Sequence, residues 1–174
     1  IIPVLNISGY NANQREEKGR DPNRDYASPC LSTPGGKLKS IRMLMDLLKT
    51  RTFTGSVTVH GYHGSFTYPW GLYADDYRTQ DDNQYRQIFS KAVSVNGYVT
   101  GTASDVVYPA NGCYEDYVYW KHGSWSGLLE LSSGSASDIQ ATVPAMAMFF
   151  DQLDSSPSNK HDFINNCARD YGPD

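Results

Sequence analysis

The chain has 174 residues, of which 39% are hydrophobic and 20% are charged, and its formal net charge is -4. This length predicts a single domain over residues 1–174, and this composition is typical of a soluble globular protein, not of a disordered or membrane-spanning one. Fifteen Lys and Arg against 19 Asp and Glu leave no basic excess to neutralise phosphates. We therefore expect neither a nucleic acid nor a membrane as partner.

The N-terminal half is predicted to contain an initial strand, a long loop, a helix and two further strands. The apolar run Ile1–Leu5 is typical of a strand covered on both faces, and we expect further sequence upstream of it. Turn-forming residues make Gly9–Gly36 a long loop, and loops of that length are usually functional. Apolar residues at helical spacing predict a helix over Lys37–Arg51. Strands are predicted over Phe53–His60, which ends in a glycine turn, and over Ser65–Tyr68.

The C-terminal half alternates between helices and strands. Thr79 with Asp82 three residues later is typical of a helix cap, so a helix is predicted from there to about Val95. The remaining predicted elements are a β-like stretch over Tyr98–Val107, a short helix over Tyr114–Lys121, a buried strand over Trp125–Leu131, a helix over Val143–Leu153 opened by Pro144, and a small helix over Asn159–Arg169. This alternation predicts an α/β fold with a mixed, mostly parallel sheet flanked by helices.

The number of tyrosines is unusual, and the number of cysteines is odd. Thirteen tyrosines suit a wide groove that recognises peptides or sugars, and they suit half-buried sheet surfaces equally well. The three cysteines, Cys30, Cys113 and Cys167, allow at most one internal disulfide. One thiol must then be free or paired outside the chain.

Four residues stand where a ligand site could form. Asn23 and Arg24 follow Pro22 in the long loop, where a guanidinium and an amide can together bind a carboxylate, although most surface arginines are simply solvated. His60 stands where a strand gives way to a glycine turn, a position from which imidazole can coordinate zinc. A structural histidine is the alternative there, and His63 is a second candidate.

Glu130 lies within the apolar strand Leu128–Leu131. A buried carboxylate is costly unless it meets a cation, a metal-bound water or a catalytic proton, and burial would move its pKa toward the range useful for a general base. Tyr108 precedes the turn Pro109–Gly112, which could move its phenol over a bound ligand. An ordinary surface tyrosine is the alternative.

Taken together, five sequence blocks resemble the zinc metallocarboxypeptidases of the carboxypeptidase A type. Pro3–Tyr10 is similar to that family's PVLNPDGF strand end, and Asp21–Tyr26 is similar to its DLNRNF loop. His60–Tyr62 with Tyr68–Trp70 resembles HSYSQ followed by YPYG, and Tyr108–Gly112 resembles its Y-x-A-S-G turn. The blocks stand in the family's order over nearly the whole chain. The resemblance implies that the chain is the C-terminal portion of a zinc-carboxypeptidase-like catalytic domain.

The resemblance also implies roles for single residues. Glu130, 22 positions after Tyr108 as in carboxypeptidase A, would be the general base and acid that activates a zinc-bound water. His60 would be a zinc ligand. Arg15 is the best candidate for stabilising the oxyanion, with Arg20 as the alternative.

Substrate recognition is implied as well. The residues expected to bind the peptide are Asn23, Arg24, Tyr108 and Tyr62, the first three at its terminal carboxylate. Glu115 would lie at the base of the side-chain pocket, where a carboxylate favours C-terminal Lys or Arg. The alternative is that Glu115 faces solvent while Asp116 makes a structural contact.

The departures from the family are also informative. The family's other two zinc ligands come from a His-x-x-Glu pair, which this sequence lacks, so we expect an N-terminal segment of the same precursor to supply them as a partner and this chain alone to be inactive. Gly61 replaces Ser, Ile7 and Ser8 replace Pro and Asp, and Cys113 stands where Gly is common. The leading hypothesis is a secreted or lumenal, zinc-dependent (Zn2+) exopeptidase acting on peptides. The alternatives are a non-catalytic carboxylate-binding module and a zinc amidohydrolase of acylated amino acids.

Overall fold

A four-stranded sheet forms the centre of the protein, for which a computed structural model describes residues 1–72, 78–157 and 167. The strands are β1 (Gly55–Gly61), β2 (Ser65–Tyr68), β3 (Val99–Thr102) and β4 (Trp125–Leu131), and their order across the sheet is β1-β4-β2-β3. β1 pairs with β4 and β2 pairs with β3 in parallel, whereas β2 and β4 are antiparallel. The mixed, mostly parallel α/β sheet predicted from the sequence is confirmed.

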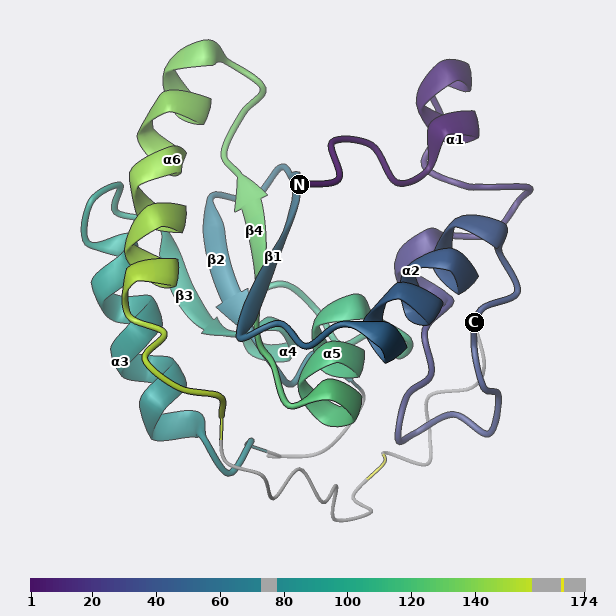
Figure 1. Ribbon diagram of the computed structural model, residues 1–174. Coiled ribbons are helices and arrows are strands. Elements are labelled where there is room, and N and C mark those ends of the chain that lie inside the picture. Colours follow the sequence, from purple (N-terminus) through teal and green to yellow (C-terminus); the bar gives the residue numbers. More distant parts are fainter. Residues whose placement is uncertain (73–77, 158–166, 168–174) are drawn as a thin grey trace.

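Helices cover both faces of this sheet (Figure 1). On one side lie α3 (Asp82–Val93) and α6 (Ala136–Asp151), which pack on each other, and on the other side lie α5 (Tyr114–His122) and α2 (Lys39–Thr50). The short elements are α1 (Ile7–Ala12), the 3-10 helix η1 (Pro22–Arg24) and α4 (Ala103–Val106). None of the described helices is long and apolar enough to cross a membrane.

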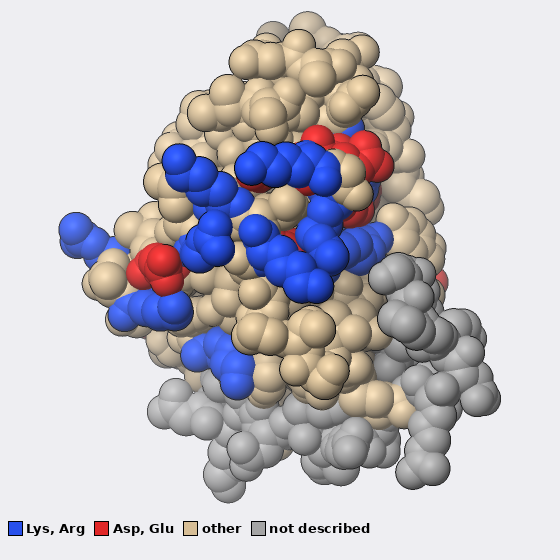
Figure 2. Space-filling view, turned by 90° about the vertical axis from the view of Figure 1, so that its right-hand side faces the viewer, with Lys and Arg blue, Asp and Glu red and all other residues tan. Residues whose placement is uncertain are grey.

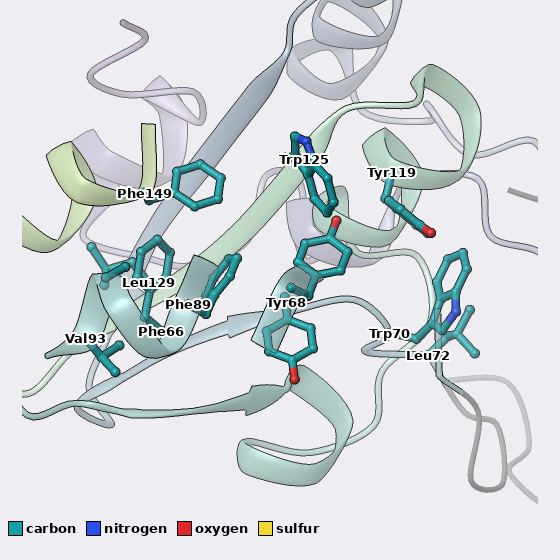
Figure 3. Close-up of a cluster of buried hydrophobic side chains, with 12 residues drawn as sticks. Phe66, Tyr68, Trp70, Leu72, Phe89, Val93, Tyr119, Trp125, Leu129 and Phe149 are labelled. Atoms are coloured by element: carbon teal, nitrogen blue, oxygen red, sulfur yellow. The ribbon is translucent and has the colours of Figure 1, made fainter. Parts of the chain in front are cut away.

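The larger core is mostly aromatic and lies between β2, β4, α3 and α6 (Figure 3). Phe66 of β2 packs on Phe89 of α3 with ring centroids 4.6 Å apart, and Tyr68 stacks on Tyr85 at 5.0 Å. The hydroxyl of the buried Tyr119 is satisfied, since it donates to Asp81 at 2.7 Å. Six tyrosines of the described residues are buried, namely Tyr26, Tyr68, Tyr85, Tyr114, Tyr117 and Tyr119. Tyrosine therefore serves this core more than an open groove.

A second core joins α2 to α5. Ile41 and Leu48 form the buried stripe of α2, and they pack with Tyr117 and Val118 of α5. The helical period of the sequence predicted this stripe, and α2 ends within one residue of the predicted end. This core fixes α2 and the preceding loop against the helix whose first turn borders the pocket described below.

Several sequence predictions about elements were wrong. The β-like stretch predicted over Tyr98–Val107 is a strand only over Val99–Thr102, and Ala103–Val106 forms the helix α4. Ile1–Leu5 is not a strand but irregular and largely exposed chain. It leads into α1, which Asn6 caps by accepting a hydrogen bond from the Gly9 amide at 2.9 Å. Helix α6 begins at Ala136 rather than Val143, because the Ser135 hydroxyl caps it. The cap of α3 is Asp81, and it makes no side-chain capping bond. The helix predicted over residues 159–169 lies outside the described residues.

The three cysteines form one disulfide and leave one free thiol. Cys30 and Cys167 form a disulfide that joins positions 137 residues apart, and Cys113 is a buried free thiol. The expectation of at most one internal disulfide is confirmed.

Candidate active site

A pocket opens where β1 and β4 end at the same edge of the sheet. Because β1 and β4 are parallel and in register, His60 lies directly opposite Glu130. Both side chains line the pocket. Glu130 was expected to be buried, but it is only half-buried, because β4 leaves the core at its last two residues. The other lining residues are Arg15, Asn23, Arg24, Gly71, Ala103, Val107, Tyr108, Ala110, Cys113, Glu115, Asp116 and Leu128.

Two residues from the turn after β1 are not brought to the pocket. His63 is exposed, and its Nδ1 lies 3.1 Å from the Ser65 hydroxyl. Tyr62 is 69% exposed, and its hydroxyl lies near Gly134. The structure therefore separates His60 from its alternative His63, and it places Tyr62 away from the pocket lining.

Asn23 and Arg24 are presented by the single turn η1. Asp21 begins this turn by accepting a hydrogen bond from the Asn23 amide at 2.9 Å, and Pro22 occupies the first helical position, where its lack of an N–H costs nothing. The Asn23 side-chain oxygen accepts from the Tyr114 backbone amide of α5 at 2.9 Å. This bond orients the side chain so that its NH2 group remains available as a donor.

The Arg24 guanidinium lies against Tyr108 although the two residues are 84 positions apart. Arg24 Nη2 donates to the Tyr108 hydroxyl at 3.1 Å, and Nη1 donates to the Asn23 carbonyl at 2.6 Å. Partial burial lowers the pKa of Arg24, but Cys113, Asp21 and Tyr108 together raise that pKa above its ordinary value. The guanidinium thus stays charged while it is partly removed from water, which strengthens its attraction for an anion.

Arg15 and Arg20 occupy different positions. Arg15 lines the pocket and donates from Nε to Asp21 Oδ2 at 2.7 Å. Its two terminal nitrogens are left to face a ligand. Arg20 lies 4.0 Å from Asp25 and is not among the lining residues. This geometry favours Arg15 as the arginine of the site.

Two adjacent carboxylates of α5 border the pocket, and both are buried. Glu115 accepts a hydrogen bond from the Thr58 hydroxyl of β1, so it does not face solvent. Asp116 accepts from the Gly71 amide with both oxygens, at 2.9 and 3.1 Å. Burial raises the pKa of Asp116 to about 7, although the amides of Gly71 and Leu72 oppose the rise. Asp116 therefore makes a structural contact with the backbone after β2, and both carboxylates line the pocket.

We predict that Asp116 makes folding stability depend on pH. Its pKa is about 7 when folded against an ordinary value of 3.8, so the folded state binds the extra proton, and stability should decrease as pH rises from about 4 to about 7. The slope expected from one proton is at most about 1.4 kcal/mol per pH unit. Asp116→Asn should flatten the free energy of unfolding across this window in urea titrations, whereas Asp46→Asn on the exposed face of α2 should not. An unchanged slope in Asp116→Asn would contradict the prediction.

Cys113 is a pocket residue that sequence reasoning missed as a contact of the site. Its thiol lies 3.5 Å from Arg24 Nη1, and burial raises its pKa well above the ordinary value, so it is a neutral thiol. The neighbouring Gly112 lies close to the same segment. Its φ is 77°, and its approach to the Arg24 carbonyl leaves no room for a side chain. The turn after Tyr108 thus closes directly on η1.

The pocket side chains do not by themselves form a metal centre. Among residues 1–72, 78–157 and 167, no group of three or more His, Cys, Asp or Glu side chains is arranged to hold a metal ion. His60 is the one imidazole lining the pocket, and a zinc site in proteins needs three or four protein ligands. The described residues therefore do not fit a complete zinc site.

The fold resembles that of known carboxypeptidases. A bovine thrombin-activatable fibrinolysis inhibitor, solved in complex with a tick carboxypeptidase inhibitor, matches at a TM-score of 0.75 and 19% identity over 88% of this chain and 68% of that chain. A second structure of thrombin-activatable fibrinolysis inhibitor matches at 0.69 and 16% identity, over 87% of this chain and 50% of that chain. Carboxypeptidase A from Helicoverpa armigera matches at 0.67 and 16% identity, over 86% and 49%. This chain thus spans about half the length of the latter two.

At this level of identity the structures establish the fold alone, and no curated protein sequence matches the chain. The family is established separately. The model of the family described as zinc carboxypeptidase, peptidase family M14, matches residues 1–150, which is most of the chain. The chain belongs to the zinc carboxypeptidase family.

Proposed function

We propose that this chain forms the substrate-binding and proton-transfer part of a carboxypeptidase that releases the C-terminal residue of peptides. The observation that carries the proposal is that donors from Asn23, Arg24 and Tyr108 line the same pocket as Glu130. A planar guanidinium and a neighbouring amide match the geometry of a carboxylate. Such a site accepts a free chain end and rejects an internal peptide bond, which has no terminal charge.

The proton transfers follow from the placement of Glu130. Its carboxylate would accept a proton from a water molecule that attacks the scissile carbonyl carbon, and it would then deliver that proton to the nitrogen of the leaving amino acid. Arg15, held at Nε by Asp21, would donate from its terminal nitrogens to the oxygen that becomes negative. Both residues line the same pocket as the donors to the terminal carboxylate.

Zinc binding would require ligands beyond His60. We propose that an N-terminal segment of the same precursor supplies a His-x-x-Glu pair. β1 is an edge strand of the described sheet, so a further strand could pair with its open side. A strand added in parallel would end beside His60. Zinc analysis tests this: the chain alone should retain much less than one equivalent after dialysis, and the chain with that segment about one. Equal zinc in both would contradict the proposal.

The free carboxylate requirement gives the main test of function. Binding to this chain should be at least about tenfold tighter for a short N-blocked peptide ending in a free carboxylate than for the same peptide ending in an amide, because only the carboxylate makes charge-assisted bonds. Isothermal titration calorimetry measures both. Equal affinities would contradict a carboxypeptidase site.

A preference for C-terminal Lys or Arg is the finer part of the proposal. The Glu115 carboxylate lines the pocket with Thr58 as its one hydrogen-bond donor among the described residues, and a cationic side chain entering the pocket would pair with it. We predict that Glu115→Gln lowers the affinity for peptides ending in Lys by about tenfold and leaves peptides ending in Phe within about twofold. Faster release of Phe than of Lys by the complete enzyme, or equal rates, would contradict this prediction.

A non-catalytic module that binds peptide carboxylates is the second candidate. It is favoured by the incomplete set of metal ligands among the described residues. A binding module, however, would not need His60 and Glu130 opposite each other in the same pocket as the donors to the carboxylate. A zinc amidohydrolase of acylated amino acids is a third candidate, and turnover of an N-acyl amino acid in preference to a peptide would favour it.

We also propose that the protein is secreted or lumenal. The Cys30–Cys167 disulfide favours a secreted or lumenal compartment, since such bonds persist where the surroundings are oxidising.

A further inference from the structure

One face of the molecule has a charge opposite to that of the whole chain. Figure 2 shows Lys and Arg side chains gathered on the side formed by α2 and the loop after α1. Nine of the 15 Lys and Arg fall within residues 15–51, against five of the 19 Asp and Glu, although the net charge of the chain is -4. We call five exposed residues of this side the basic face, namely Lys18, Arg20, Lys37, Lys39 and Arg42.

Within residues 1–72, 78–157 and 167, most cations of the basic face have no ion-pair partner. Within residues 15–20 and 36–42, Glu16 is the exposed acid, because the Glu17 side chain is buried. Among ion pairs of the described residues, the basic face contributes one, between Arg20 and Asp25 at 4.0 Å. Such a group of neighbouring, uncompensated charges attracts anions over about a Debye length.

Glu17 holds the first part of the basic face, Lys18 and Arg20, in place. It forms an isolated backbone bridge with Arg20, and Lys18 and Gly19 turn between them with φ of 53° and 75°. The buried Glu17 carboxylate accepts a hydrogen bond from the Ser40 hydroxyl in the first turn of α2. The turn is thereby docked on α2, with Lys18 and Arg20 facing outward.

Asp25 holds the second part of the basic face, around Lys37 and Lys39, in place. Its Oδ2 accepts from the Leu38 amide at 2.7 Å, between Lys37 and Lys39, while its Oδ1 faces Arg20. Asp25 is 1% exposed, so it shapes the backbone from beneath and presents little negative surface. The arrangement is therefore pre-organised, which reduces the entropy cost of binding a ligand.

Arg15 connects the basic face to the pocket. It lines the pocket, and it also lines an open groove beside α1 together with Gly9, Tyr10, Asn11, Asn13 and Gln14. Arg15 is separated by Glu16 alone from the turn Glu17–Arg20, which carries Lys18 and Arg20. A peptide whose last residue fills the pocket would leave it past Arg15, beside the basic face.

We propose that the basic face binds acidic residues that precede the C-terminal residue of the peptide substrate. This inference rests on the proposed function. Continuity with the pocket through Arg15 favours a peptide as occupant over other polyanions. No aromatic residue lies within residues 15–20 or 36–42, so these segments offer no platform for stacking bases.

The test uses four peptides that share one C-terminal residue. Their upstream residues are either four Glu or four Ser, and each ends in a carboxylate or an amide. At low salt, about 0.02 M, the Glu peptides should bind this chain about fivefold to tenfold tighter than the Ser peptides, and near 0.5 M the ratio should approach one. The double variant Lys37→Glu with Lys39→Glu should abolish the ratio at low salt, whereas Lys91→Glu on the exposed side of α3 should preserve it.

The outcomes separate the two proposals. Equal binding of Glu and Ser peptides at low salt would overturn the basic face as a substrate subsite even if carboxylates bind better than amides. Equal binding of carboxylates and amides, with the Glu preference retained, would overturn the proposed function alone. Displacement of Glu peptides by a sulfated oligosaccharide that binds at least about tenfold tighter, with no dependence on the terminal carboxylate, would identify the face as a polysaccharide site and overturn the peptide assignment.

Discussion

Glu130→Gln is expected to lower the kcat of the complete, zinc-loaded enzyme by about a hundredfold to ten-thousandfold. The amide keeps the size of the side chain but cannot accept a proton from the attacking water. Affinity for the peptide should change by less than about twofold, because Glu130 is not one of the residues proposed to bind the terminal carboxylate. The measurement is product release followed by chromatography, with peptide affinity determined separately by calorimetry.

The fold should tolerate this change, because Glu130 is half-buried at the end of β4 and pairs with β1 and β2 through its backbone. Asp151→Asn, exposed in the last turn of α6, is the matched control and should retain full activity. If Glu130→Gln kept more than about a tenth of the wild-type kcat, the residue could not be the main proton carrier.

Arg24→Ala is expected to weaken binding of peptides with a free C-terminus by about a hundredfold, the loss that accompanies truncation of one partner of a partly buried charge pair. Arg24→Lys should recover only part of this affinity, because an ammonium cannot offer two parallel donors to a carboxylate. The same peptides ending in an amide should bind both variants and the wild type nearly equally. Calorimetry with the two peptide forms measures the difference.

Arg86→Ala is the control for loss of a surface arginine. Arg86 is exposed on α3 and pairs with Asp82 one turn away, so its removal should leave peptide affinity unchanged. If Arg24→Ala still preferred carboxylate peptides over amide peptides, another group would have to bind the terminal carboxylate.

The parts of the fold predicted from the sequence are those with strong local patterns. β4 was predicted to the residue, and α2 and α5 within two residues at either end, because period and flanking turn residues agreed there. The strand prediction for Ile1–Leu5 was wrong because an apolar run does not distinguish a strand from exposed chain that precedes a capped helix. Helix α6 was predicted too short because Pro144 was taken as a helix start, whereas it lies inside the helix.

The position of a candidate site residue was predicted where it follows from the residue's place on an element. His60 and Glu130 are each the last residue but one of a strand, and parallel pairing puts such positions together. Contacts that depend on tertiary packing were not predictable: Thr58 with Glu115, and Cys113 with Arg24, join segments 57 and 89 residues apart. Tyr62 was expected at the pocket by resemblance, but the turn after β1 directs it to the surface.

The contact between Arg24 and Tyr108 has a consequence for folding. One segment belongs to the loop before α2 and the other to the turn before α5, 84 positions apart, so they meet only when the chain between them has folded. A bound carboxylate that contacts both residues would therefore bind the assembled state and not the unfolded chain, and its presence would raise the melting temperature in proportion to the logarithm of its concentration. Thermal shift with a series of small carboxylates would thus report on the integrity of the whole tertiary structure through a single pocket.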